Sequence, residues 1–82
     1  MYTEDEIKKK IKNIFFEVFP KLSENDFQWE KEQKDYENWD SFAQLNIITI
    51  TESNFDIEFS LEESIEIKSP IDLLELVKTH LK

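Results

Sequence analysis

The stretch Asn38-Trp39-Asp40-Ser41-Phe42 divides this 82-residue chain into two parts with different patterns. Before this stretch, the sequence predicts one amphipathic helix and a long polar connection. After it, apolar residues recur at spacings that are typical of a compact series of helices. Ser41 therefore stands where the connection ends and a helix begins, with an acid before it and a large apolar residue after it.

The first helix is predicted over residues 3–18. Thr3 and Glu6 form a capping-box pattern, in which each side chain can bond the backbone N–H of the other residue. Pro20 cannot continue a helix, and it disfavours helical geometry at Phe19. The apolar positions of this segment recur at helical spacing, at Ile7, Ile11, Ile14, Phe15 and Val18.

The connection over residues 21–36 is rich in charge and shows no sustained period. A connection of this length is unusual in a compact domain unless it has a role or packs locally. We expect a short helical turn at residues 23–26. We also expect Phe27 and Trp29 to lay their apolar surface back onto the helices.

A second long helix is predicted over residues 41–54. The apolar positions Phe42, Leu45 and Ile48, with Ile47 and Ile50 across the helix, mark a wide apolar surface. The β-branched run at residues 47–51 also resembles a strand, but its length and flanking pattern favour a helix. Residues 55–59 alternate like a strand only briefly, so we expect an extended link whose apolar side chains close the end of the bundle.

Two further helices complete the chain. Ser60 and Glu63 form a second capping-box pattern before a short helix over residues 61–66. Ser69 as N-cap and Pro70 at the first helical position open the last helix. Its buried stripe is expected to contain Ile71, Leu74, Val77 and Leu81, flanked by Leu73 and Leu76.

Together these elements predict an all-α fold. It is a small helical bundle of three longer helices and one short helix, with a long first connection, in a single domain over residues 1–82. A chain of this length can fill one modest core but not two. We expect it to be a monomer.

Composition excludes several classes of function. The net charge of −9, from 19 acids and 10 bases, argues against nucleic acid and for a basic protein partner. The chain has no glycine, so it holds no phosphate-binding loop, and no cysteine, so it holds no thiolate nucleophile or disulfide. No apolar run is long enough to cross a membrane, and residues 1–5 lack the charge of a signal peptide. We therefore expect a cytoplasmic protein.

A membrane-surface helix is one alternative for the first segment, since four lysines lie between residues 8 and 12 beside Phe16 and Phe19. Three acids at the start of that helix argue against it.

Catalysis by the chain alone is also disfavoured. His80 is the only histidine and complements the negative end of its helix, and Ser41 lies in no nucleophile-elbow motif. The sequence also predicts no metal site, because calcium loops require a glycine.

The tripeptide Asp40-Ser41-Phe42 resembles the modification site of the acyl carrier proteins. The resemblance extends to the later apolar positions Leu45, Ile48, Phe55, Ile57 and Phe59 and to the segment 67–73. In that family an Asp-Ser-Leu-like tripeptide opens the second helix of a small bundle. Its serine is esterified with 4′-phosphopantetheine. The resemblance covers roughly residue 35 to the C-terminus, and a long first connection is common to both.

The resemblance implies a carrier of acyl or aminoacyl groups, held as thioesters on 4′-phosphopantetheine from coenzyme A. It places the attachment at Ser41 and gives Asp40 a role in holding the metal during transfer. The partners that it implies are a holo-carrier-protein synthase (a phosphopantetheinyl transferase), acyl or aminoacyl ligases, and acyltransferases or condensing enzymes. The expected docking residues are Phe42, Leu45, Glu62, Glu63 and Glu66.

The acids are placed unusually for a carrier of fatty-acid synthesis, in which the second helix is markedly acidic. Residues 43–51 contain no acid here, and acids gather instead at Glu58, Glu62, Glu63 and Glu66. Since charges at the edge of an interface select partners, this pattern predicts a specialised pathway of lipid or secondary-metabolite biosynthesis. The alternative is that the placement of these acids varies freely among carriers, because such charges are often energetically minor.

Two alternatives stay open at this point. A serine at a helix start is most often an N-cap, although Asp40 can take that position and leave the Ser41 hydroxyl free. The whole chain can also be read as an unmodified acidic helical protein that binds a basic partner. That reading explains the charge but not the pattern from Trp39 to Leu73.

Overall fold

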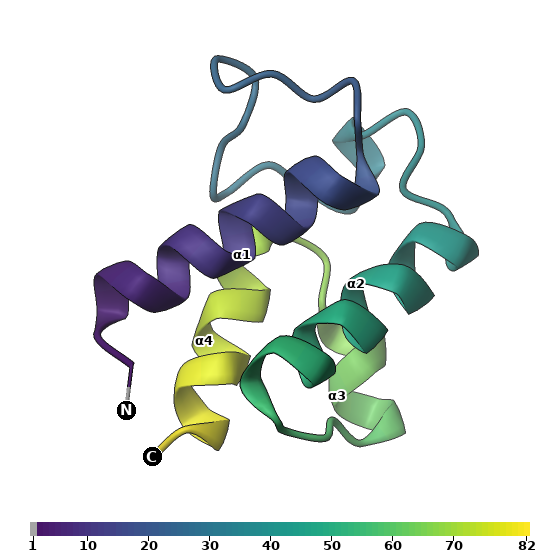
Figure 1. The fold of residues 1–82 in the computed structure, drawn as a ribbon. Coiled ribbons are helices and arrows are strands. Elements are labelled where there is room, and N and C mark those ends of the chain that lie inside the picture. The colour runs from purple at the N-terminus through teal and green to yellow at the C-terminus, as the bar shows by residue number, and fades with distance from the viewer. Residues whose placement is uncertain (1) are drawn as a thin grey trace.

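The computed structural model describes residues 2–82 and is all-helical over that range. Its helices are α1 (Glu4–Val18), α2 (Ser41–Phe55), α3 (Leu61–Glu66) and α4 (Pro70–His80), with a 3₁₀ turn η1 (Gln33–Asp35) in the first connection. The described residues form no strand. The predicted bundle of three longer helices, one short helix and a long first connection is therefore confirmed (Figure 1).

The helix boundaries follow the local signals of the sequence. The capping boxes of Thr3 and Ser60 are both formed, and Ser69 caps α4 with Pro70 at its start. The C-cap that follows α2 is Asp56, whose φ of 54° is left-handed. Aspartate tolerates this conformation better than most residues, which suits a chain without glycine.

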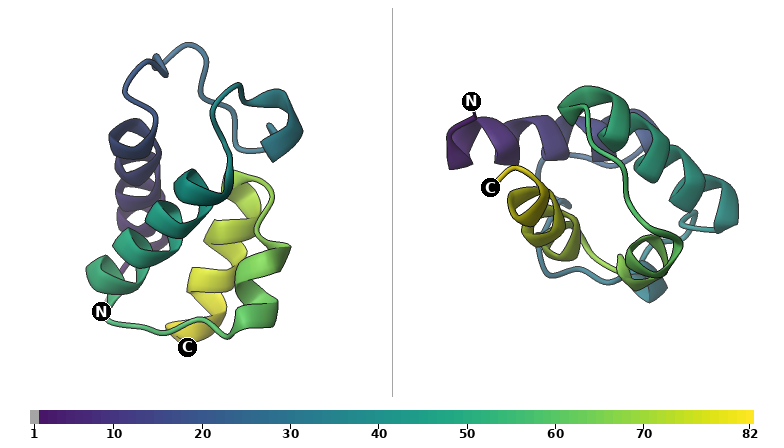
Figure 2. Two further views of the ribbon diagram at one scale, coloured as in Figure 1. Left: turned by 90° about the vertical axis from the view of Figure 1, so that its right-hand side faces the viewer. Right: turned by 90° about the horizontal axis from the view of Figure 1, so that it is seen from below.

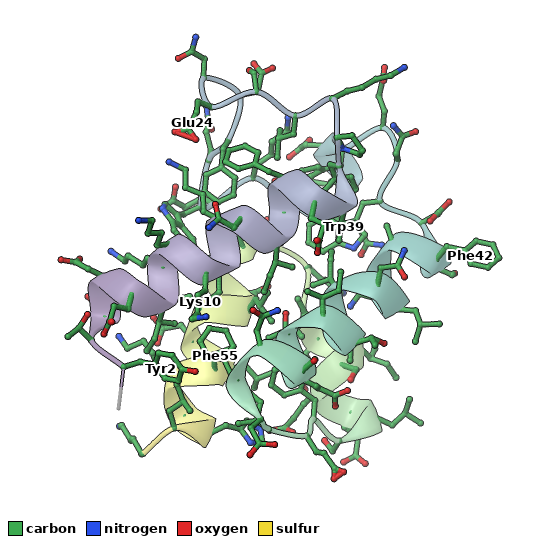
Figure 3. All side chains as sticks on the ribbon, viewed as in Figure 1. Tyr2, Lys10, Glu24, Trp39, Phe42 and Phe55 are labelled. Carbon is green, nitrogen blue, oxygen red and sulfur yellow. The ribbon has the colours of Figure 1, made fainter. Side chains whose placement is uncertain are left out.

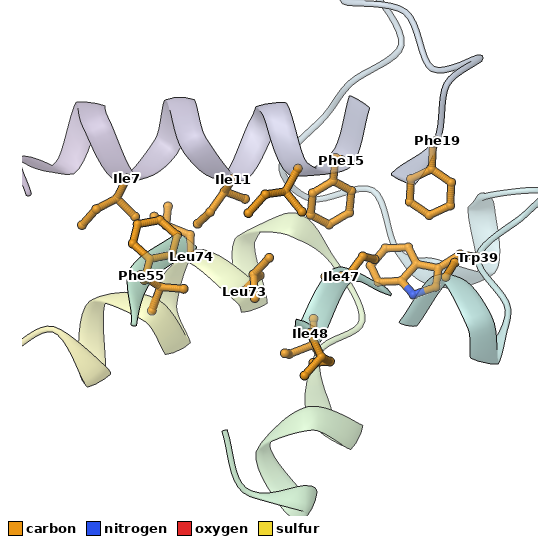
Figure 4. Packing of buried hydrophobic residues seen from close by; sticks show 14 of the residues in the cluster. Ile7, Ile11, Phe15, Phe19, Trp39, Ile47, Ile48, Phe55, Leu73 and Leu74 are labelled. Atoms are coloured by element: carbon orange, nitrogen blue, oxygen red, sulfur yellow. The ribbon is translucent and has the colours of Figure 1, made fainter. Parts of the chain in front are cut away.

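The core lies where α1 packs against α2 and α4 (Figure 4). Ile11 and Phe15 of α1 are fully buried, as are Ile47 of α2 and Leu73 and Val77 of α4. The start of α1 and the end of α4 lie at one end of the molecule, and the long connection lies at the other (Figures 1 and 2).

The buried face of α4 differs from the predicted stripe. Leu73 is buried as fully as Leu74 and Val77, whereas Ile71 and Leu81 are only half-buried. The cause is Pro70, which is itself buried and starts a stripe that continues three, four and seven residues later. The helix is thus rotated by about one residue relative to the expectation.

Two smaller corrections concern the helix ends. Phe55 is the last residue of α2 and is buried in the core, so it does not belong to the extended link. Val18 is only half-buried, and Phe19, just beyond the end of α1, takes its expected place in the core.

The long connection packs against the bundle through aromatic rings and two backbone hydrogen bonds. Phe27 is buried and Trp29 is half-buried, as predicted. The N–H of Gln33 donates to the carbonyl of Lys68, and the N–H of Ile71 donates to the carbonyl of Trp29 at 2.9 Å. The connection is thereby attached to the segment between α3 and α4, which fixes the approach of the chain to α2.

None of the helices in residues 2–82 combines the length and the apolar character that a membrane span requires.

Candidate functional site

Asp40, and not Ser41, caps the start of α2. Its Oδ1 accepts a hydrogen bond from the backbone N–H of Ala43 at 2.9 Å, and its backbone is extended. Ser41 follows as the first helical residue and is exposed. None of the hydrogen bonds among residues 2–82 involves its hydroxyl. Since Asp40 supplies the cap, the Ser41 hydroxyl is exposed and unpaired among residues 2–82.

The position of Ser41 favours an attached anion. It lies at the N-terminus of a helix of 15 residues, where the backbone N–H groups and the helix dipole create a positive end. A phosphodiester on the Ser41 oxygen would lie at this end. The geometry therefore fits 4′-phosphopantetheine, and Asp40 is exposed beside it.

Trp39 holds this start in place. Its ring is 5% exposed and packs edge-on against Phe15 and Tyr36, with centroid distances of 5.5 Å and 5.1 Å. Figure 4 shows it beneath Phe19, whose centroid lies 5.9 Å away. The carbonyl of Trp39 accepts a hydrogen bond from Nε2 of Gln33 at 3.1 Å. The residue before the Asp-Ser pair is thus fixed on several sides.

Gln44 links this start to α3. Its Oε1 accepts a hydrogen bond from the Trp39 indole N–H at 2.6 Å. Its Nε2 donates to the carbonyls of Ser64, at 2.7 Å, and Ile67, at 3.1 Å. Sequence reasoning missed this residue, because its partners lie 20 and 23 positions away and no local pattern announces them.

Among residues 2–82, four large hydrophobic side chains are exposed, and these four lie on α2 and α3. We call them the apolar face: Phe42 (79% exposed), Leu45 (62%), Leu61 (75%) and Ile65 (63%). Phe42 points away from the bundle (Figure 3). Exposed apolar patches of this kind mark interaction surfaces.

The apolar face borders a groove between α2 and α3. The groove is lined by Ser41, Gln44, Leu45, Ile48, Leu61 and Ile65, among others. Sequence reasoning found Phe42 and Leu45 but missed Leu61 and Ile65. Their spacing of four residues, which places both side chains on one face of a short helix, was the available signal.

The three predicted docking acids of α3 are not equivalent. Glu62 and Glu66 are exposed. Glu63 instead bonds within the chain, because its Oε1 accepts from the backbone N–H of Ser60 at 2.8 Å and its Oε2 lies 3.1 Å from Nε2 of His80. The backbone N–H of Ser60 is the main cause that holds the pKa of Glu63 below its ordinary value, and His80 adds to the effect.

His80 has more contacts than the sequence indicated. Besides Glu63, its ring packs edge-on against Phe59 with centroids 5.2 Å apart. His80 therefore links the end of α4 to the start of α3. It lies apart from the lining of the groove beside Ser41.

The charges of the chain are segregated. Residues 37–67 contain eight acids and no base, so all ten bases, each a lysine, lie outside this segment. Because α2 and α3 belong to this segment, the apolar face lies in the acidic part of the chain.

Two comparisons with known proteins, one with family profiles and one with curated sequences, found no match to this chain.

Proposed function

We propose that this protein is a carrier of acyl or aminoacyl groups, bound as thioesters to 4′-phosphopantetheine on Ser41. The observation that carries the proposal is the exposed, uncommitted Ser41 hydroxyl at the first position of α2, with the helix cap supplied by Asp40. When bound, the prosthetic group supplies the thiol that a chain without cysteine lacks.

The attachment step is a phosphoryl transfer from coenzyme A. The Ser41 oxygen forms the new P–O bond, its proton passes to a base of the partner transferase, and the 3′-phosphorylated adenosine phosphate of coenzyme A leaves. Asp40 caps α2 through Oδ1, and no hydrogen bond among residues 2–82 involves its Oδ2. That oxygen is the one that we assign to the metal of the transferase.

The partners dock on the apolar face. Phe42 and Leu45 of α2 and Leu61 and Ile65 of α3 supply buried area, and the exposed Glu62 and Glu66 meet basic groups at the rim. The partners are a holo-carrier-protein synthase and the ligases, acyltransferases or condensing enzymes that use the cargo. The carrier itself catalyses no step, and we place it in the cytoplasm with these partners.

The test is the intact mass after incubation with coenzyme A and a broad-specificity phosphopantetheinyl transferase. We expect the mass to rise by one phosphopantetheine in the wild type and in Ser53→Ala, which alters another exposed serine of α2. Ser41→Ala should stay unmodified and keep its helical circular-dichroism signal. An unchanged wild-type mass would remove the carrier function and leave an acidic interaction protein as the better reading.

A further inference from the structure

The junction between α2 and α3 is closed next to Ser41. One side chain, that of Gln44, accepts a hydrogen bond from Trp39 and donates to the carbonyls of Ser64 and Ile67. Both polar atoms of its carboxamide are therefore occupied. Separating α2 from α3 at this point would leave two carbonyls and an indole N–H without these partners.

The interior behind this junction is filled. Ile47 and Leu73 are fully buried, and Ile67 is 1% exposed. None of these three lines the groove beside Ser41, whose apolar floor is Ile48. At the same end of the bundle, Trp39 and Phe15 pack ring against ring with centroids 5.5 Å apart. An arm that extends from Ser41 over α2 and α3 thus meets the groove and not the core.

We propose that the cargo of this carrier is a short or polar acyl group, aminoacyl groups included, which stays in the groove between α2 and α3 and does not enter the bundle. This inference rests on the proposed function. Entry of an alkyl chain would break the Gln44 hydrogen bonds and displace packed side chains. Unpaired buried polar groups and displaced packed side chains together oppose the gain from burying the alkyl chain.

The groove between α2 and α3 does not shield a long alkyl chain from water as a buried cavity would. Gln44, Ser64 and Gln33 line it together with the apolar residues, so part of its wall is polar. It is also open, and a chain lying in it keeps one side in water. A long alkyl cargo would therefore remain largely hydrated, whereas a short or polar cargo loses little in that position.

The experiment compares three cargoes on the wild-type protein. The transferase is supplied with acetyl-, alanyl- or octanoyl-coenzyme A, and intact mass establishes loading. The thermal midpoint and the hydrolysis rate of each thioester are then measured, with the same acyl group on free pantetheine as reference. We expect equal midpoints for the acetyl and octanoyl forms, and hydrolysis rates within about twofold of the free reference, because buried cargo alone would stabilise the folded state.

A variant tests the part assigned to Gln44. In Gln44→Ala the three hydrogen bonds are lost, and we expect the octanoyl thioester to hydrolyse more slowly than in the wild type. Gln28→Ala, which alters an exposed glutamine of the connection, should behave as the wild type. Equal octanoyl hydrolysis in Gln44→Ala and the wild type would overturn the role of Gln44.

The outcomes separate the two proposals. A raised midpoint and a protected thioester in the octanoyl form of the wild type would overturn the short or polar cargo and leave the carrier function intact. Failure to load any of the three cargoes would overturn the carrier function, and with it this inference.

Discussion

At the scale of single residues, Asp40 supplies the N-cap of α2, and Ser41 follows it as the first residue of the helix. We expect Asp40→Ala to lower the free energy of unfolding by about 0.5–2 kcal/mol, because the Ala43 N–H loses its acceptor. Ser41→Ala should change it by less than about 0.5 kcal/mol, as exposed substitutions usually do. Urea unfolding of both variants measures the difference. A larger decrease in the free energy of unfolding for Ser41→Ala than for Asp40→Ala would show that Ser41 is the N-cap.

Thr51 is a polar residue on the buried side of α2. It is fully buried in α2, and its hydroxyl has no hydrogen-bond partner among residues 2–82. We expect Thr51→Val to raise the free energy of unfolding by about 1 kcal/mol, since an unpaired buried hydroxyl is costly and the β-branched shape is kept. Thr49→Val, at an exposed position of the same helix, is the control. A loss of stability in Thr51→Val would show that the hydroxyl is paired.

The sequence narrowed the N-cap of α2 to Asp40 or Ser41, because a helix cap depends on residues only a few positions apart, and the structure shows that Asp40 is the cap. The burial of Thr51 could not be predicted in the same way. Apolar residues lie on several sides of α2, so periodicity does not say which side faces α1. Only the packing of α1 decides that Ile47, Ile48 and Thr51 are buried while Phe42 and Leu45 are exposed.

At the scale of elements, α3 is the least anchored helix. It contributes no buried residue, and its polar links to other helices start from two neighbouring residues in its middle, Glu63 to His80 and the carbonyl of Ser64 to Gln44. Its bounds were predicted from the local signal of Ser60 and Glu63. Its links to α2 and α4 were not, because their partners are 17 to 23 residues apart in the chain.

The Glu63 carboxylate makes stability depend on pH in the acid range. Its folded pKa lies below the ordinary value of 4.5, so its contribution is present above that value and is lost as the pH falls through the lower, folded pKa. We expect the thermal midpoint to decrease between about pH 5 and pH 3, and to decrease less steeply in Glu63→Gln. Glu62→Gln, which removes an exposed charge from the same helix, is the matched control. If the thermal midpoint falls equally steeply with pH in Glu63→Gln and in the wild type, Glu63 is not the source of the pH dependence.

At the scale of the molecule, stability depends on the contact of α1 with α2 and α4. Leu74 is 2% exposed at this contact and points toward α1 (Figure 4). We expect Leu74→Ala to cost about 2–5 kcal/mol, a large part of the stability of a small domain. Leu45→Ala, on the apolar face, should cost less than about 0.5 kcal/mol in urea unfolding. Similar losses in the two variants would mean that Leu45 packs as tightly as a core residue.

The distribution of charge over the molecule bears on the pathway of the proposed carrier. The acids of residues 37–67 avoid the middle of α2: residues 43–51 contain none, and Asn46 stands where a carrier of fatty-acid synthesis would typically have one. The exposed acids Glu62 and Glu66 lie on α3 instead. A partner enzyme whose basic groups are arranged to meet acids in the middle of α2 would find no acid at residues 43–51 of this chain. Charges at the edge of an interface mainly set the association rate.

We therefore expect the modified protein to be a poor substrate for the malonyl transferase and condensing enzyme of primary fatty-acid synthesis. Its kcat/KM should be at least about tenfold lower than that of the system's own carrier, because electrostatic steering changes association rates by about 10–10³-fold. Introducing an acid with Asn46→Glu should recover part of the difference, whereas Asn54→Glu, an exposed asparagine at the far end of α2, should recover less. Loading and extension as efficient as with the native carrier would refute a specialised pathway, since the missing α2 acids would then have no effect on partner choice.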